Sequence, residues 1–187
     1  NTTFTYKNKK VPVSNHIAFK DTTTSACLGI EICEDLWVTI PVSSTHALAG
    51  ANVLCNLSAS NEIISKANYR RNLVKDQSAK CYAGYIYASA GPTESSSDLV
   101  FSGHNLICEN GAILNETKTD KIIYGQIDLD HLNHDRLHYK TSMQDFFHVN
   151  YTTVDFASKP IHEIEFTRYI DAYPFVPNNQ DERIVRC

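Results

Sequence analysis

One short apolar run, followed at once by two carboxylates, constrains the fold of this chain most strongly. Residues 26–33 have the sequence Ala-Cys-Leu-Gly-Ile-Glu-Ile-Cys, and Glu34 and Asp35 follow directly. This length and composition are typical of a buried strand, which places Cys33 at the strand's carboxyl end. On a tight turn from a strand into a helix, a cysteine is presented to solvent beside backbone N–H groups that stabilise a thiolate or an oxyanion. Cys33 is therefore a candidate nucleophile, although a cysteine on a buried strand is by itself more often a structural thiol.

The segments around this strand alternate between helix and strand. A second buried strand is predicted at 52–57, an amphipathic helix at 66–82 and a third strand at 85–88. This order predicts an α/β fold with a sheet covered by helices, rather than an all-β barrel. The other predicted elements are strands at 11–13, 16–19, 105–108, 112–114 and 121–127, with a two-residue Asn110-Gly111 turn, a helix through residues 45–49 capped by Ser43 or Ser44, and a polar helix from His131 to about Lys140 capped by Asp130.

Charge and cysteine content exclude several classes of partner. The chain has 17 Lys and Arg against 21 Asp and Glu, a net charge of −4, and no basic cluster longer than two residues. This balance argues against nucleic acid or an anionic membrane as the main partner. No apolar run approaches the roughly 18 residues that cross a bilayer. The six cysteines contain no Cys-x-x-Cys pair and lie mostly in apolar runs, which predicts reduced thiols in a cytoplasmic protein.

The residues around Cys33 and beyond resemble the nitrilase, or carbon–nitrogen hydrolase, superfamily. A further block resembles, within that superfamily, the glutaminase domain of bacterial-type glutamine-dependent NAD synthetases. The resemblance is dense over residues 28–114 and implies part of an α-β-β-α sandwich, namely the C-terminal portion of the domain. The superfamily motifs are residues 29–37, Pro41, residues 47–53 and 56–61, Lys66 and residues 69–71, and the glutaminase block comprises residues 77–85 and 94–104.

The resemblance also implies roles for individual residues. Cys33 would attack the side-chain amide of L-glutamine and form a γ-glutamyl thioester. Ser60 and Lys66 would hold the substrate's α-carboxylate and amino end, and Glu34 would contact the substrate, its backbone N–H being a candidate oxyanion donor. A charge-assisted hydrogen bond from Lys66 to a partly desolvated carboxylate contributes about 1.5–3 kcal/mol. Without the resemblance, Lys66 would be a solvated residue in a first helical turn, and Ser60 a loop or capping residue.

The family's catalytic glutamate and lysine lie well upstream of the nucleophile, where this chain offers no counterpart. Only 32 residues precede Cys33, and the only acids among them are Asp21 and Glu31. The sequence also lacks a Gly-rich loop for ATP phosphates. We therefore expect residues 1–140 to be the C-terminal portion of the glutamine amidohydrolase domain, and residues 141–187 to be a connector toward an absent synthetase domain.

The resemblance further implies which ligands and partners each domain binds. No cofactor or metal is expected in this portion, whereas ATP, Mg and deamido-NAD are expected at the absent synthetase domain. The expected partners are L-glutamine, the synthetase domain of the same polypeptide and further copies in a homo-oligomer. Because the triad is incomplete here, we expect the isolated piece to be inactive.

Two alternatives to this function remain open at this point. One is a nitrilase-like amidase for another small amide, and the other is a non-catalytic assembly module. A metal site on His131, His134 and His138, which share one helix face, is disfavoured because no fourth ligand has a convincing spacing. Residues 94–98 form either an active-site loop or an exposed turn, and Trp37 is expected to be a packing anchor at the mouth of the site.

Overall fold

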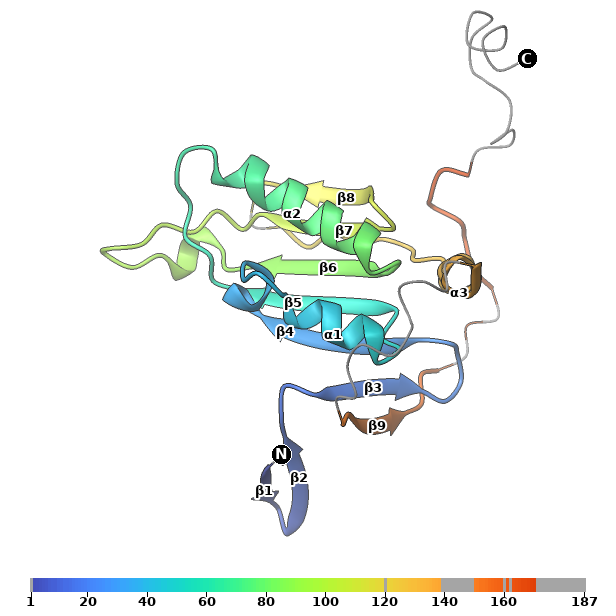
Figure 1. Ribbon diagram of the computed structural model, residues 1–187. Helices are drawn as coiled ribbons and strands as arrows, with labels where there is room; N and C mark the ends of the chain where they lie inside the picture. Colours follow the sequence, from blue (N-terminus) through green and yellow to red (C-terminus); the bar gives the residue numbers. More distant parts are fainter. Residues whose placement is uncertain (1, 120, 139–149, 160, 162, 171–187) are drawn as a thin grey trace, which may run out of the picture.

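A seven-stranded mixed sheet forms the centre of the structure, a computed structural model that describes residues 2–119, 121–138, 150–159, 161 and 163–170 (Figure 1). The α/β class predicted from the sequence is confirmed. The strand order is β8-β7-β6-β5-β4-β3-β9. The strands are β3 Ile17–Asp21, β4 Cys27–Ile32, β5 Val53–Ser58, β6 Gly84–Ser89, β7 Asn105–Glu109, β8 Ala112–Thr117 and β9 Thr152–Phe156.

The three central strands β4, β5 and β6 run parallel, so their carboxyl ends meet at one edge of the sheet. The strands β3 and β7 flank them in antiparallel directions, and β8 returns from β7. The turn between β7 and β8 has positive φ at Asn110 and Gly111, as the predicted two-residue hairpin requires. At the other edge β9 pairs in parallel with β3. It lies within the stretch predicted as a connector, and the division at residue 140 stays a prediction.

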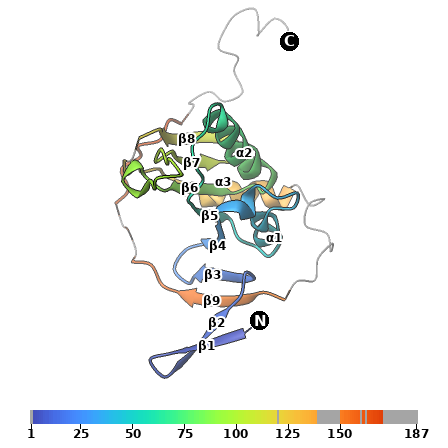
Figure 2. The same cartoon turned by 90° about the vertical axis from the view of Figure 1, so that its left-hand side faces the viewer.

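Two helices cover one face of this sheet, α1 Val42–Leu48 and α2 Lys66–Lys80 (Figures 1 and 2). The helix α1 approaches β4 closely because Gly29 has no side chain: a Cβ at this position would lie 2.6 Å from Cβ of His46. Between the helices and the sheet lies the core, whose fully buried members include Leu36, Leu54, Val74, Tyr85 and Leu106. None of the described helices is long and apolar enough to traverse a bilayer.

Two predicted helix caps are wrong. The helix α1 begins after Pro41, and Ser43 lies inside it, where its hydroxyl accepts a hydrogen bond from Gln77 Nε2 at 3.0 Å. The helix α3 Leu129–His138 is capped by Asp128, whose Oδ1 accepts the N–H of His131 at 2.9 Å, rather than by Asp130. In α1 the N-cap position is taken by Pro41 and no side chain caps the helix, whereas in α3 two nearby aspartates could cap and the sequence does not distinguish them.

The predicted strand at 121–127 is also wrong, because this segment lies on the second face of the sheet and does not extend its edge. Gly84 makes room for it, since a Cβ there would be 2.6 Å from Ile127 Cδ1. Its carbonyl groups receive side-chain hydrogen bonds instead of a ladder, from Asn105 to Lys121 O at 3.1 Å and from Asn115 to Tyr124 O at 2.8 Å. Ile127 therefore packs on β6 and Gly125 on β7, whereas Ile122 and Tyr124 of the same segment are exposed.

A small hairpin precedes the main sheet and stands away from it (Figure 1). It consists of β1 Thr2–Tyr6 and β2 Lys9–Val13, which pair antiparallel. Lys7 and Asn8, with φ of 47° and 63°, form the two-residue turn. Only the second of these strands was predicted from the sequence, because Lys7-Asn8 is a weaker turn signal than Asn-Gly.

Candidate active site

Cys33 lies on a strained turn at the carboxyl end of β4. It is the first residue of the 3-10 helix η1 Cys33–Leu36 and has a φ of 50°, in the left-handed region that residues other than glycine rarely adopt. Asp35 supports the turn because its Oδ2 accepts the N–H of Ile32 at 2.9 Å. The thiol is half-buried. A conformation of this kind costs on the order of 1–3 kcal/mol, and such strain is concentrated at functional sites.

The neighbouring strands supply hydroxyl groups to the Cys33 sulfur. The Oγ of Ser58, at the end of β5, donates to Cys33 Sγ at 3.7 Å, and the hydroxyl of Tyr87 on β6 donates to Ser58 Oγ at 2.6 Å. Burial raises the pKa of Tyr87, which keeps this hydroxyl protonated. Ser60 also hydrogen-bonds with Tyr87. A chain of hydroxyl groups, from Tyr87 through Ser58, therefore ends at the Cys33 sulfur.

Glu31, two residues before the cysteine, is buried and fully occupied by donors. Its carboxylate accepts the N–H of Ser43 at 2.5 Å, the Nδ2 of Asn56 at 3.2 Å and the hydroxyl of Tyr85. Burial and the neighbouring carboxylate of Glu31 raise the pKa of Tyr85 well above its ordinary value. With three donors on it, the carboxylate of Glu31 is a structural acceptor and not a free general base.

Lys66 begins α2 and brings a cation to the same end of the sheet. Its Nζ donates to Asn61 Oδ1 at 2.7 Å and lies 5.3 Å from the ring centroid of Trp37. Desolvation and the charge of Arg70 lower the pKa of Lys66, and the carboxylate of Glu62 opposes this, as does Cys33. The predicted packing anchor Trp37 thus contacts a predicted substrate-binding residue, with which it forms a cation–π pair.

An ionic network centred on the buried Arg70 connects residues 60–66 to the β8 end of the sheet order. Arg70 is completely buried, and its guanidinium donates to Glu62 Oε2 and to His104 Nδ1, each at 3.0 Å. His104 Nε2 lies 3.0 Å from Glu116 Oε1, and Arg71 donates to the other oxygen of Glu116 at 2.8 Å. This network ties residues 60–66 to β7 and β8, and nothing in the sequence analysis indicated it.

The structure thus brings three of the four predicted site residues into one region. Cys33, Ser60 and Lys66 lie at the carboxyl ends of β4 and β5, where ligand sites of α/β sheets occur. The side chain of the fourth, Glu34, is exposed on η1. The segment at 94–98 is exposed and extends beyond the carboxyl end of β6 (Figure 1). The roles of these residues stay predictions, to which the geometry adds Asn56, Ser58 and Tyr87.

The histidines of α3 lie far from this site and make local contacts. His131 Nε2 is 3.6 Å from Asp135, His138 Nδ1 is 2.9 Å from the carbonyl of His134, and the rings of His134 and His138 are 4.2 Å apart. Within the described ranges, no three side chains of His, Cys, Asp or Glu are arranged to hold a metal ion.

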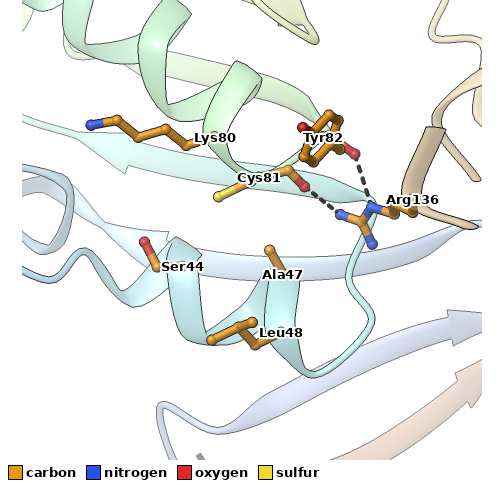
Figure 3. A pocket seen from close by; sticks show the side chains of 7 residues that line it. All are labelled: Ser44, Ala47, Leu48, Lys80, Cys81, Tyr82 and Arg136. Carbon is orange, nitrogen blue, oxygen red and sulfur yellow. Dashed lines mark hydrogen bonds between the residues drawn. The ribbon is translucent and has the colours of Figure 1, made fainter. Parts of the chain in front are cut away.

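A shallow pocket of about 160 Å³ lies between α1 and the end of α2 (Figure 3). Arg136 of α3 lines it and donates to the carbonyl oxygens of Cys81 at 2.8 Å and Tyr82 at 2.9 Å. Burial raises the pKa of the Cys81 thiol to about 12, which favours its protonated form. The pocket lies at the end of the sheet opposite Cys33, and Arg136 connects α3 to the end of α2 there.

Comparison with solved structures identifies the class of fold. A carbon–nitrogen hydrolase from Helicobacter pylori G27 matches 73% of this chain and 51% of its own, with a TM-score of 0.59 and 17% identity. The chain therefore has the fold of nitrilase-superfamily proteins, and the fold class predicted from the sequence is confirmed. A glutamine-dependent NAD(+) synthetase from Cytophaga hutchinsonii matches 62% of this chain and 17% of its own, with a TM-score of 0.51 and 29% identity.

Sequence comparison identifies the particular relatives. Over 160 residues, 80% of this chain, the glutamine-dependent NAD(+) synthetase of Mycobacterium tuberculosis is 39% identical. The homologues of this chain are glutamine-dependent NAD synthetases, and the predicted resemblance is confirmed. The chain spans 24% of the length of this relative. No family model matches the chain.

Proposed function

We propose that this chain is part of the glutaminase domain of a glutamine-dependent NAD synthetase and that Cys33 is its nucleophile. The observation that carries the proposal is the strained turn, or elbow, at Cys33, whose sulfur accepts a hydrogen bond from the Ser58 hydroxyl and interacts electrostatically with Lys66. The homology supplies the reaction: the names of the relatives state that they use glutamine to make NAD(+).

In the proposed reaction the Cys33 thiolate attacks the side-chain carbonyl carbon of L-glutamine. The C–N bond breaks, the nitrogen takes up a proton and leaves as ammonia, and a γ-glutamyl thioester remains on the sulfur. Water then hydrolyses the thioester to glutamate and restores the thiolate. The N–H of Glu34, in the first turn of η1, has no partner within that helix and is assigned to the oxyanion.

Substrate binding is assigned to Ser60 and Lys66, with Glu34 at the exposed edge of the site. The general base that the reaction requires is assigned to another segment of the full protein, since the carboxylate of Glu31 is occupied. We assign residues 1–140 to the glutaminase domain and residues 141–187 to the connector. The ammonia would then amidate deamido-NAD at a synthetase domain that binds ATP and Mg, in a cytoplasmic homo-oligomer.

An electrophilic glutamine analogue, such as a diazoketone, tests this function in the complete protein. We expect one adduct per chain, mapped to Cys33, because the site holds the analogue's amino-acid end and presents its electrophilic carbon to the thiolate. Intact-mass spectrometry detects the adduct and peptide mapping locates it. Excess glutamine should slow the formation of the adduct. An adduct that glutamine does not slow would favour an amidase for another substrate, and no adduct would favour a non-catalytic module.

Replacing Lys66 by glutamine is expected to raise the KM for glutamine by roughly 10- to 100-fold, since a charge-assisted hydrogen bond to the substrate's carboxylate is lost. Steady-state measurement of ammonia release checks this. Lys80→Gln is the matched control, because Lys80 is exposed at the opposite end of the same helix and should leave the KM unchanged. Equal effects of the two substitutions would contradict the assigned role of Lys66.

A further inference from the structure

We infer that Asn56 is a positioning residue for the nucleophile, because its side-chain amide clamps the backbone of Cys33 from the neighbouring strand. The inference rests on the proposed function and adds to it a residue outside the resemblance-based assignments. Asn56 lies within β5, and its side chain is 1% exposed. Its position opposite Glu31 in the β4–β5 pairing brings it beside the elbow.

The amide of Asn56 contacts both peptide groups of Cys33. Its Oδ1 accepts the N–H of Cys33 at 3.1 Å, and its Nδ2 lies 3.4 Å from the Cys33 carbonyl oxygen, to which it donates. The register of β4 and β5 extends only to Ile32 opposite Leu57. Asn56 therefore continues the hydrogen bonding for one residue beyond the strand pair, at the residue whose φ of 50° is unfavourable.

Glu31 fixes the orientation of this amide. The Nδ2 of Asn56 also donates to Glu31 Oε1 at 3.2 Å, and that carboxylate is held in turn by Tyr85 and by the N–H of Ser43. A flipped amide would place its oxygen against the carboxylate and its NH₂ against the N–H of Cys33, so only one orientation satisfies all partners. A rigid, buried chain from β6 through β4 to β5 thus ends on the nucleophile.

The clamp has two consequences for the reaction. It holds the sulfur in one place relative to the substrate carbonyl, where a displacement of about 1 Å costs roughly 100-fold in rate. It also occupies the N–H of Cys33, which is then unavailable to the oxyanion and leaves that task to the N–H of Glu34. Asn56 therefore acts through Cys33 and does not touch the substrate.

The chain offers a closely matched control in Asn52. Its Oδ1 accepts the N–H of Cys27 at 2.8 Å, its Nδ2 donates to Ser25 O at 2.8 Å, and it is 2% exposed. Asn52 therefore holds the backbone at the beginning of β4, whereas Asn56 holds it just beyond the end. The beginning of β4 lies away from the candidate site. Asn52→Ala and Asn56→Ala remove the same kind of interaction, and only the second one touches the nucleophile.

We expect Asn56→Ala, in the complete protein, to lower kcat for glutamine hydrolysis by about 100-fold with a KM within about threefold of the wild type. Asn56→Asp keeps the volume and the oxygen acceptor but sets a carboxylate against Glu31, and should lose at least about 10-fold in kcat. Asn52→Ala should keep kcat within about threefold, although its thermal midpoint should fall by as much as that of Asn56→Ala.

A kcat near the wild-type value in either Asn56 variant, or an equal loss in Asn52→Ala, would overturn the inference. Failure of both Asn56 variants to fold, with Asn52→Ala folded, would assign the amide to stability alone and would also overturn it. The rate at which iodoacetamide alkylates Cys33 tests the positioning role of Asn56 separately from the proposed glutaminase function. If the wild type does not hydrolyse glutamine, the function fails, whereas a roughly 10-fold change in alkylation rate confined to the Asn56 variants still supports the clamp.

Discussion

Replacing Cys33 by alanine is expected to abolish glutamine-dependent NAD synthesis in the complete protein while leaving synthesis from added ammonia intact. The loss should be at least about 10³-fold, because without a sulfur no thioester forms, and no other cysteine in the described residues lies on such an elbow. Free ammonia bypasses this step, so its use depends only on the proposed synthetase domain. Parallel assays with glutamine and with ammonium as nitrogen donor measure the two activities.

Cys55→Ala serves as the control for this prediction. Cys55 is a half-buried thiol on β5, and burial raises the pKa of this thiol, so it is not expected to react. Its replacement should leave both activities within about threefold of the wild type. Equal loss of the glutamine-dependent and ammonia-dependent activities in Cys33→Ala would mean that Cys33 is structural, and would contradict the proposed function.

Replacing Arg70 by methionine is expected to lower the free energy of unfolding by about 3–5 kcal/mol. The guanidinium is completely buried, and its loss leaves the buried ring of His104 and the partly buried carboxylate of Glu62 without their shared partner. Arg71→Met is the control, since the side chain of Arg71 is 41% exposed and its ion pair with Glu116 should contribute less than about 1 kcal/mol. Denaturant titration of both variants measures the difference, and a loss in Arg70→Met no greater than that in Arg71→Met would contradict the prediction.

The difference in free energy of unfolding between the wild type and Arg70→Met should also depend on pH. Burial raises the pKa of Glu62, but hydrogen bonds from Ser102 and Arg70 outweigh it and hold the pKa below its ordinary value. A lowered pKa in the folded state stabilises the protein above the ordinary pKa of glutamate, and this contribution is lost as the pH falls through the lowered value. The gap in stability between wild type and Arg70→Met should therefore narrow in acid.

Local patterns allowed much of the fold to be predicted from the sequence. The strand that ends at Cys33 is apolar and of limited length, and Asn110-Gly111 is the strongest short hairpin signal, so both were predicted correctly. The segment at 121–127 has the composition of a strand but packs on the face of β6 and β7. Composition indicates a strand, but it does not show whether such a segment pairs at the edge of a sheet or crosses its face, where Ile122 and Tyr124 are exposed.

The candidate site was predictable only in part, for a different reason. Cys33 could be predicted as a candidate nucleophile because the turn on which it lies is formed by its own neighbours in the chain. Arg70 and His104 are 34 residues apart, and Asn56 and Cys33 are 23 apart, so their contacts depend on strand order and register. A buried arginine or asparagine has no local pattern that distinguishes it from an exposed one. The positioning groups therefore became visible only in three dimensions.

The pairing of β9 with β3 has a consequence for how the chain folds. Ile17 lies opposite Thr152, so this parallel pair closes a loop of about 135 residues, whereas β4, β5 and β6 are joined by short crossovers. Contacts between residues so distant in sequence form slowly, because loop-closure entropy must be overcome first. During synthesis β3 therefore emerges long before its partner, and its outer edge is unpaired until late in folding. We therefore expect β3 to be the strand of the nascent chain that most needs protection from pairing with other molecules.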